Sequence, residues 1–337
     1  MRPDLNIDFI GKSKIYYTIS LTLITLGILV SIIFGVKLDI QFTGGAIIRY
    51  TYTGDVSTST AQQVAQSALP GKLVDASTDV NYVTHQKTLV LDINKNLTSD
   101  EQATLFSAES KQFSGNQLAK GQSTDVAASM GRAFFQKSLL ALVLASVLII
   151  LYIWIRFRKI GGLPAGIFAF VALMHDVIIG FVAFSVMRFT INDNFVAVTL
   201  TILGYSINDT IVVFDRVREN RRLYGQKIPF KDIVNKSINQ SFARSINTTL
   251  VTFVAIAVIA VFSFLYRLDS LTSFALPMMV GVVTGCYSTI CIAGPLWVTW
   301  ETHKEKRAAA AKLVAAQERE EHKKRLEAAR TGKKNKR

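Results

Sequence analysis

The sequence is short of the residues on which most enzymatic and metal chemistry depends. Its 337 residues include two cysteines, four histidines and six prolines, and these have no zinc-site spacing. The sequence also lacks a Walker loop, a nucleophile elbow and a GxGxxG fingerprint. We therefore expect no enzyme activity, no catalytic residue, no metal and no cofactor, so the energy for any work must come from outside the chain.

The two cysteines do not predict a disulfide bond. Cys286 and Cys291 lie five residues apart in one apolar run. On a helix that spacing turns the two side chains about 140° away from each other, which prevents a bridge between them. We expect both to be packing residues.

The sequence is instead rich in long apolar runs. Half of the chain, 50%, is hydrophobic, and the runs are about twenty residues long, which is the length a helix needs to cross a hydrocarbon core of about 30 Å. We expect six spans and treat the first as an uncleaved anchor, because it is long and lacks an Ala-x-Ala cleavage pattern. The expected spans are approximately Ile15 to Val36, Ser138 to Ile155, Leu163 to Met187, Asn194 to Asp215, Ser245 to Tyr266 and Leu271 to Trp300.

Positive charge is distributed unevenly among the loops. Lys and Arg gather between spans two and three and between spans four and five, whereas the alternate turns carry Arg188 with Asp193 and Arg267 with Asp269. The positive-inside rule therefore makes the basic loops and both termini cytoplasmic. The net charge of +14 needs no nucleic-acid partner, since such residues set topology and bind the lipid bilayer. The basic residues are Arg156, Arg158, Lys159, Arg216, Arg218, Arg221, Arg222, Lys227, Lys231 and Lys236.

The region from 37 to 137 is the one sizeable soluble segment between spans. Its alternating and capped stretches predict strands near 47–52, 72–76, 87–94 and 117–122 and helices over 57–69 and 98–113. The order βαββαβ is typical of a ferredoxin-like domain. Gly44 and Gly45 indicate a tight turn where the first span passes into this domain.

The predicted fold is thus a multi-pass α-helical membrane protein with six transmembrane helices and a small α/β ferredoxin-like extracytoplasmic domain. We divide the chain into a cytoplasmic N-terminus (1–14), the first span (15–36), the extracytoplasmic domain (37–137), the bundle of remaining spans (138–300) with a cytoplasmic loop (216–244), and a basic cytoplasmic tail (301–337). The Ala-rich, charged composition of the tail predicts a helix.

The polar residues inside the spans are the candidate site. A charged side chain at bilayer depth costs at least about 2.5 kcal/mol, so Asp209 in the fourth span indicates an ion or proton site. Tyr205 and Ser206 lie within one turn of it and predict a hydroxyl-lined route. Arg244 has a matching depth in the fifth span if that helix begins near Lys236, so we expect an Asp209–Arg244 ion pair.

His175 and Asp176 place a further polar pair in the third span, which we assign to proton coupling with Asp209 and Arg244. We expect the three sites to converge because few such residues face lipid. Asp215 and Arg216, at the membrane surface, are expected to set topology or order the loop. Gly281 and Gly285 form a GxxxG pair, for which close static packing is the favoured interpretation.

Four stretches of the sequence resemble the SecD/SecF family of bacterial protein-export subunits. They are GYSINDTIVVFDRVREN (204–220), NKSINQSFARSINTTL (235–250), LMHDV (173–177) and YIWIRFR (152–158). The first contains Gly204, Asp215, Arg216 and Asn220 as well as Asp209. The resemblance covers the six-span region and ends before the tail. One departure is LDIQFTGG, where Gln41 stands in place of the acidic residue that the family usually has before the Phe.

This resemblance implies one half of a pseudo-symmetric unit of the resistance-nodulation-division superfamily in the bacterial cytoplasmic membrane. It implies SecD as partner, association with the SecYEG channel and with YidC and YajC, and a preprotein substrate. It also implies that the proton gradient, or sometimes a sodium gradient, drives the late steps of preprotein translocation, with ion passage at Asp209 and Arg244. Two alternatives stay open, a small-molecule or lipid exporter of the same superfamily and a purely structural subunit.

Overall fold

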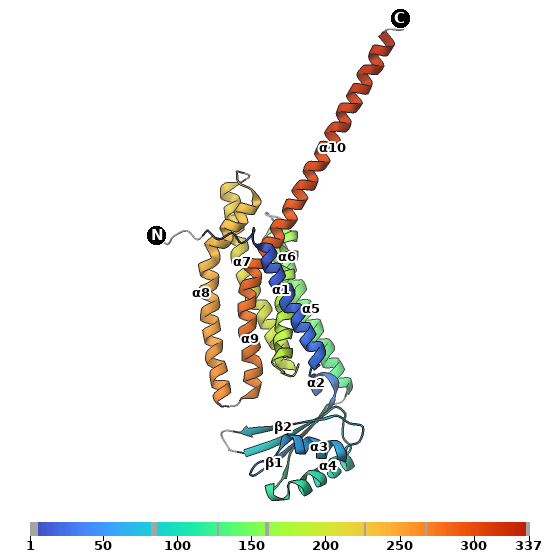
Figure 1. Cartoon of the computed structure of the whole chain (residues 1–337), viewed down its shortest axis with the longest axis vertical. Coiled ribbons are helices and arrows are strands. Elements are labelled where there is room, and N and C mark those ends of the chain that lie inside the picture. The colour runs from blue at the N-terminus through green and yellow to red at the C-terminus, as the bar shows by residue number, and fades with distance from the viewer. Residues whose placement is uncertain are drawn as a thin grey trace.

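A helical bundle carries an α/β domain at one end and a long projecting helix at the other (Figure 1). The structure is a computed structural model that describes residues 6–81, 86–126, 128–158, 162–225, 227–266 and 268–334. Lys159 and Arg267, on which part of the orientation argument rests, lie outside these ranges, as do residues 1–5 and 335–337 of the expected terminal segments.

Six helices among the described residues are long and apolar enough to cross a membrane, as the sequence predicts. The apolar windows of the first two spans are 17% and 11% buried, against 50% for the third and 67% for the sixth. The third and sixth spans therefore form the centre of the bundle. The spans lie in α1 (Ser13–Phe34), α5 (Ala128–Arg156), α6 (Gly162–Val186), α7 (Asp193–Tyr224), α8 (Phe230–Leu265) and the run from α9 (Asp269–Ser288) into α10 (Gly294–Lys334).

The segment between the fourth and fifth spans is a helical hairpin, which corrects the loop expected over residues 216–244. α7 continues to Tyr224, and α8 begins at Phe230 and not near Lys236. Gly225 follows α7 with a φ of 59°, a backbone conformation that suits glycine at a helix end. Both helices continue past their apolar runs, and polar side chains there join α7 to α8, as Asn220 does with Ser237 and Gln240.

A π-helical turn, η3 (Thr289–Ala293), interrupts the sixth span between α9 and α10. No pattern in the sequence predicts this turn. Cys286 and Cys291 flank the start of this turn and are both buried and unbridged in the part of the chain that the structure describes, as expected. α10 then continues through the charged tail as the predicted helix and projects away from the bundle (Figure 1).

The α/β domain has the predicted ferredoxin-like order. Its sheet is arranged β2-β3-β1-β4 with antiparallel neighbours. Ser57 caps its first helix, and Thr98 and Glu101 form a capping box at its second. The second and fourth strands both lie later than the residues expected for them. The elements are β1 (Gly45–Tyr52), α3 (Thr58–Ala68), β2 (Val74–Asn81), β3 (Gln86–Ile93), α4 (Ser99–Gln112), η1 (Ser114–Asn116) and β4 (Ala119–Val126).

The chain leaving α1 is tied to the turn between α6 and α7. Asp39 N donates to Ile191 O over 3.0 Å, and Ile191 N donates to Lys37 O over 2.8 Å. The guanidinium of Arg188 donates to Phe34 O over 2.6 Å. Arg188 therefore holds the end of α1 against the turn between α6 and α7.

A short helix and a double-glycine turn connect the first span to the domain. After α2 (Ile40–Thr43), Gly44 and Gly45 have φ values of 79° and 145°, as the predicted tight turn requires. A Cβ on Gly45 would lie 2.2 Å from Ile93 O, and one on Gly131 of α5 would lie 2.7 Å from Gly44 N. Glycine is required here because three backbone segments meet.

Candidate functional site

The carboxylate of Asp209 lies between α7 and α8. Ser245 Oγ on α8 donates a hydrogen bond to Asp209 Oδ1. Asp209 Oδ2 has no hydrogen-bond partner among the described residues, although it is shielded from solvent. A carboxylate has about four lone-pair sites, so this group retains the capacity to accept a proton or another donor.

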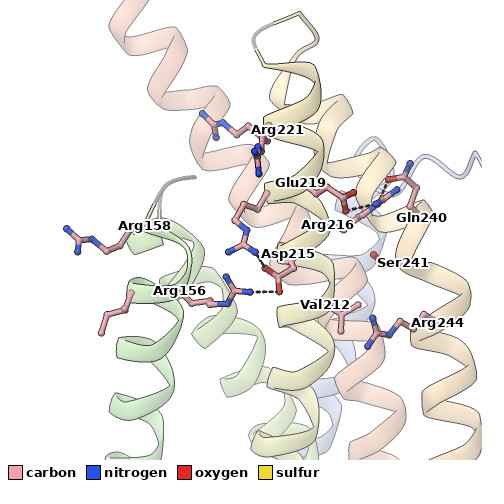
Figure 2. A pocket seen from close by; sticks show the side chains of 13 residues that line it. Arg156, Arg158, Val212, Asp215, Arg216, Glu219, Arg221, Gln240, Ser241 and Arg244 are labelled. Carbon is pink, nitrogen blue, oxygen red and sulfur yellow. Dashed lines mark hydrogen bonds and ion pairs between the residues drawn. The ribbon is translucent and has the colours of Figure 1, made fainter.

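Arg244 does not form the expected ion pair with Asp209 in this structure. Its guanidinium makes no ion pair within the described ranges and instead borders a cavity beyond the end of α5 (Figure 2). Its positive charge still acts on the Asp209 carboxylate through space. Successive helical residues point about 100° apart, so Ser245 and Arg244 cannot both face Asp209. The expected depth of Arg244 assumed a helix start near Lys236, whereas α8 begins at Phe230, and apolar run length carries no information on helix rotation.

Tyr205 lies one turn from Asp209 on the same interface between α7 and α8. Its hydroxyl donates to Thr249 Oγ1 over 3.1 Å. Tyr205 with Thr249 and Asp209 with Ser245 therefore form two rungs, four residues apart on each of two antiparallel helices. The hydroxyl-lined interface beside Asp209 is present, but Ser206 is not part of it.

Ser206 belongs to a second polar network, centred on Asp176. This side chain is completely buried, and its Oδ2 accepts hydrogen bonds of 2.7 Å from both Ser206 on α7 and Ser288 on α9. Asp176 Oδ1 lies 3.0 Å from His175 Nδ1. The polar sites of the third and fourth spans thus pack on two different faces of α7, and the expected convergence is not observed among the described residues.

The glycine pair of α9 makes this second network possible. A Cβ on Gly285 would lie 3.1 Å from Ser206 Cβ, and one on Gly281 would lie 2.2 Å from Ile202 Cδ1. α9 therefore packs closely on α7, and Ser288 reaches Asp176 immediately before the π-helical turn. Turns of this kind are frequent at functional sites.

Two serine partners, Ser245 and Ser288, were not predicted from the sequence, whereas Thr249 was expected near Asp209. Ser245 and Ser288 carry no signal of their own because such side chains in a helix often bond to a carbonyl of the preceding turn. Thr210 likewise pairs with Thr289 of η3, with 2.8 Å between their hydroxyl oxygens. The available signal for these partners was the presence of serines and threonines within otherwise apolar spans.

The remaining motif residues join helices near the hairpin. Asp215 pairs with Arg156 at 3.1 Å and with Arg218 at 2.9 Å, which connects α7 to α5 (Figure 2). Arg216 pairs with Glu219 at 2.5 Å and donates to Gln240 over 2.7 Å.

Buried Asn220 donates to Ser237 over 2.8 Å and to Gln240 over 2.7 Å, which holds α7 against α8. Gly204 differs from these residues, because, apart from the backbone of its own helical turn and its chain neighbours, no described atom lies within 4 Å of the Cβ position that a larger residue would occupy there.

The chain matches the family model for protein export membrane protein SecD/SecF, C-terminal, over residues 106–303. A protein translocase subunit SecF from Sebaldella termitidis is 34% identical over 295 residues, covering 87% of this chain and 91% of that protein. The protein translocase subunit SecDF of Bacillus subtilis is 29% identical over 306 residues, covering 90% of this chain and 39% of that protein. The crystal structure of SecDF from Thermus thermophilus has a TM-score of 0.71 and 28% identity, covering 90% of this chain and 40% of that chain.

Proposed function

This chain belongs to the SecD/SecF family of protein-export membrane proteins, so its function is an accessory role in Sec-dependent export, and we propose that this role is coupled to the proton gradient. Relatives in which SecD and SecF form one SecDF chain support SecD as its partner. The proposed assembly also contains the SecYEG channel, with YidC, YajC and the emerging preprotein. The chain acts there as a translocation subunit and not as an enzyme.

The proposed orientation places both termini and the α7–α8 hairpin in the cytoplasm and the α/β domain outside. The positive-inside rule supports this assignment. The α/β domain and the hairpin lie at opposite ends of the bundle, and the start of α1 lies at the hairpin end (Figure 1). A single orientation therefore places every described basic loop on the cytoplasmic side.

The open oxygen of Asp209 is the observation that carries the coupling proposal. A proton that binds there removes a charge which Ser245 and the nearby Arg244 stabilise. The neutral and charged forms then favour different packing of α7 against α8, which is the differential interaction that any population shift requires. Tyr205 and Thr249 lie on the same interface and move with it. The Asp176 network holds the opposite packing partner, α9, in place.

The size of the driving force limits this mechanism. One charge crossing about 100 mV supplies about 2.3 kcal/mol, whereas moving a two-state equilibrium from about 1:99 to about 99:1 needs about 5.5 kcal/mol. One proton biases the helix arrangement, and two or three drive it. The partner half therefore contributes further ion sites or further protons pass per cycle.

Substitution of Asp209 and Arg244 in the assembled SecD-containing complex tests the proposal. In proteoliposomes with an imposed proton gradient, D209N and R244M are expected to abolish gradient-dependent stimulation of preprotein translocation while complex yield stays unchanged. D193N, which removes a carboxylate from the first turn of the same helix, is the matched control and keeps stimulation. Full stimulation in both D209N and R244M refutes the coupling role.

The same assay separates the alternatives. A fall in complex yield with intact coupling in the surviving complexes identifies a structural subunit. Stimulation by a sodium gradient in place of a proton gradient identifies sodium as the coupling ion.

A further inference from the structure

A basic cavity opens at the hairpin end of the bundle, where α5 ends beside α7 and α8 (Figure 2). Its volume is about 1600 Å³, and its lining includes seven arginines but only two acids, Asp215 and Glu219. Neither the Sec function nor the proposed ion coupling accounts for so many guanidinium groups around one cavity. Topology signals need to lie on the cytoplasmic side, but they do not need to face one another.

The two acids leave much of this positive charge without a counterion. Asp215 pairs with Arg156 and Arg218, and Glu219 pairs with Arg216. Within the described ranges, three further lining arginines form no ion pair, namely Arg158, Arg222 and Arg244. The arrangement therefore favours an anionic ligand, and planar guanidinium groups are suited to phosphate oxygens, which they bind with two parallel hydrogen bonds.

The lining also changes character with depth. Ile155 precedes Arg156 at the end of α5, and Val212 lies about one turn before Asp215 on α7, so these two apolar residues lie on the membrane side of the arginines of α5 and α7, with Arg244 of α8 beside Val212 (Figure 2). Arg221 and Arg222 lie farther along α7, beyond the apolar run. A ligand that fits both parts has an anionic head and an apolar continuation, whereas a free anion or an acidic peptide uses only the basic part.

We propose that this cavity binds the phosphate headgroup of an anionic phospholipid from the adjacent leaflet. The headgroup lies among the arginines and the first part of its acyl chains contacts Ile155 and Val212. Such a lipid connects α5 to α7 and α8 across a gap that the Arg156–Asp215 pair alone bridges among the described ion pairs. The proposal does not depend on ion coupling at Asp209.

Lipid binding to the purified, delipidated full-length protein in complex with SecD tests this proposal. Native mass spectrometry measures the affinity for added phosphatidylglycerol, with phosphatidylcholine and inorganic phosphate as separate arms. The double variant R158Q/R222Q is expected to bind phosphatidylglycerol roughly thirtyfold more weakly, because each basic residue near the membrane surface contributes about a fivefold factor. The control R307Q/R319Q removes the same charge from α10, outside the cavity, and is expected to keep wild-type affinity.

Four outcomes overturn the proposal. They are equal affinity for phosphatidylglycerol and phosphatidylcholine, an equal loss in the control, inorganic phosphate binding as tightly as the lipid, and binding to the isolated subunit but not to the complex. The last identifies the partner protein as the occupant.

If R158Q/R222Q does not assemble, R158K/R222K supplies the test, because it keeps the charge but loses the bidentate contact. It is expected to weaken phosphatidylglycerol binding by a smaller factor, and unchanged affinity in it argues against guanidinium recognition.

Discussion

Asp176 and Asp209 are two acids in the same bundle with opposite surroundings. Asp176 has no exposed surface and three hydrogen-bonding neighbours from three helices. Asp209 is half-buried, has one donor and keeps an oxygen without a described partner. A fully bonded buried carboxylate rigidifies its surroundings, whereas a partly bonded one can exchange a proton without breaking a network. The two acids of the candidate site therefore differ in their number of hydrogen-bond donors, and Asp209 is the one with an oxygen available for a proton.

Removing each acid in turn gives the largest expected difference. D176A leaves the hydroxyls of Ser206 and Ser288 without the carboxylate they share and removes the neighbour of His175, and each buried polar group left unsatisfied costs about 1 to 3 kcal/mol, so the expected loss is about 3 to 5 kcal/mol. D209A leaves only Ser245 without its acceptor, so its expected cost is about 1 kcal/mol. Denaturant unfolding of the purified proteins in one detergent measures both free energies of unfolding. Equal losses contradict the distinction between the two acids.

Glu109 extends the comparison to a buried acid outside the membrane. It is completely buried in the α/β domain, neither carboxylate oxygen has a described partner, and burial raises its pKa to about 7. The folded domain holds this proton more tightly than the unfolded chain. The free energy of unfolding of the α/β domain therefore falls by roughly 3 kcal/mol as the pH rises from about 4.5 to about 7.

Hydrogen exchange at β1 and β3 in the full-length protein, corrected for intrinsic rates, measures this slope. E109Q has no titrating group at the position and is expected to lack the pH dependence, whatever its absolute stability. A slope of the same size in E109Q assigns the effect to another group.

Gly285 tests how closely the Asp176 network depends on the packing of α9. G285A places a Cβ 3.1 Å from Ser206 Cβ, so the two helices must move apart slightly and the bond from Ser206 to Asp176 lengthens. We expect a loss of about 1 to 3 kcal/mol. G204A is the matched control on α7, where the added methyl group meets no described atom within 4 Å. The expected result there is no loss in thermal stability, since alanine favours a helix over glycine by about 1 kcal/mol.

Tyr205 gives the smallest expected effect. Y205F removes the hydroxyl that donates to Thr249 but keeps the ring, so the expected loss is about 1 kcal/mol in the free energy of unfolding. Chemical denaturation of Y205F beside wild-type protein measures it. A T249V variant is expected to show a similar loss, and the double variant should lose no more than either alone. Additive losses in the double variant contradict a direct bond between the two hydroxyls.

Sequence patterns predicted most of the fold because the signals are local. Apolar run length predicted six spans, and the capped helices and alternating strands predicted the ferredoxin-like domain. The hairpin of α7 and α8 was expected to be a loop because hydropathy detects where the membrane ends and not where a helix ends. The π-helical turn at Thr289–Ala293 was missed, since no residue type marks the single extra residue that produces it.

The candidate site was predicted residue by residue but not pair by pair. Asp209, Asp176 and Arg244 stand out because ionisable groups are rare inside apolar spans. Their partners depend on how each helix is rotated, which placed Ser245 and not Arg244 against Asp209 and turned Ser206 toward Asp176.

The sequence by itself determined which residues lie within the membrane, at what depth, and in which order the elements follow one another, because helix rise and apolar length are properties of each segment alone. Only the tertiary structure decided which acid is fully bonded, which has an oxygen without a partner among the described residues, and which arginines surround a common cavity. Helix rotation and neighbour choice follow from the packing of side chains across the whole bundle, in which close approaches such as Gly285 on Ser206 select one arrangement.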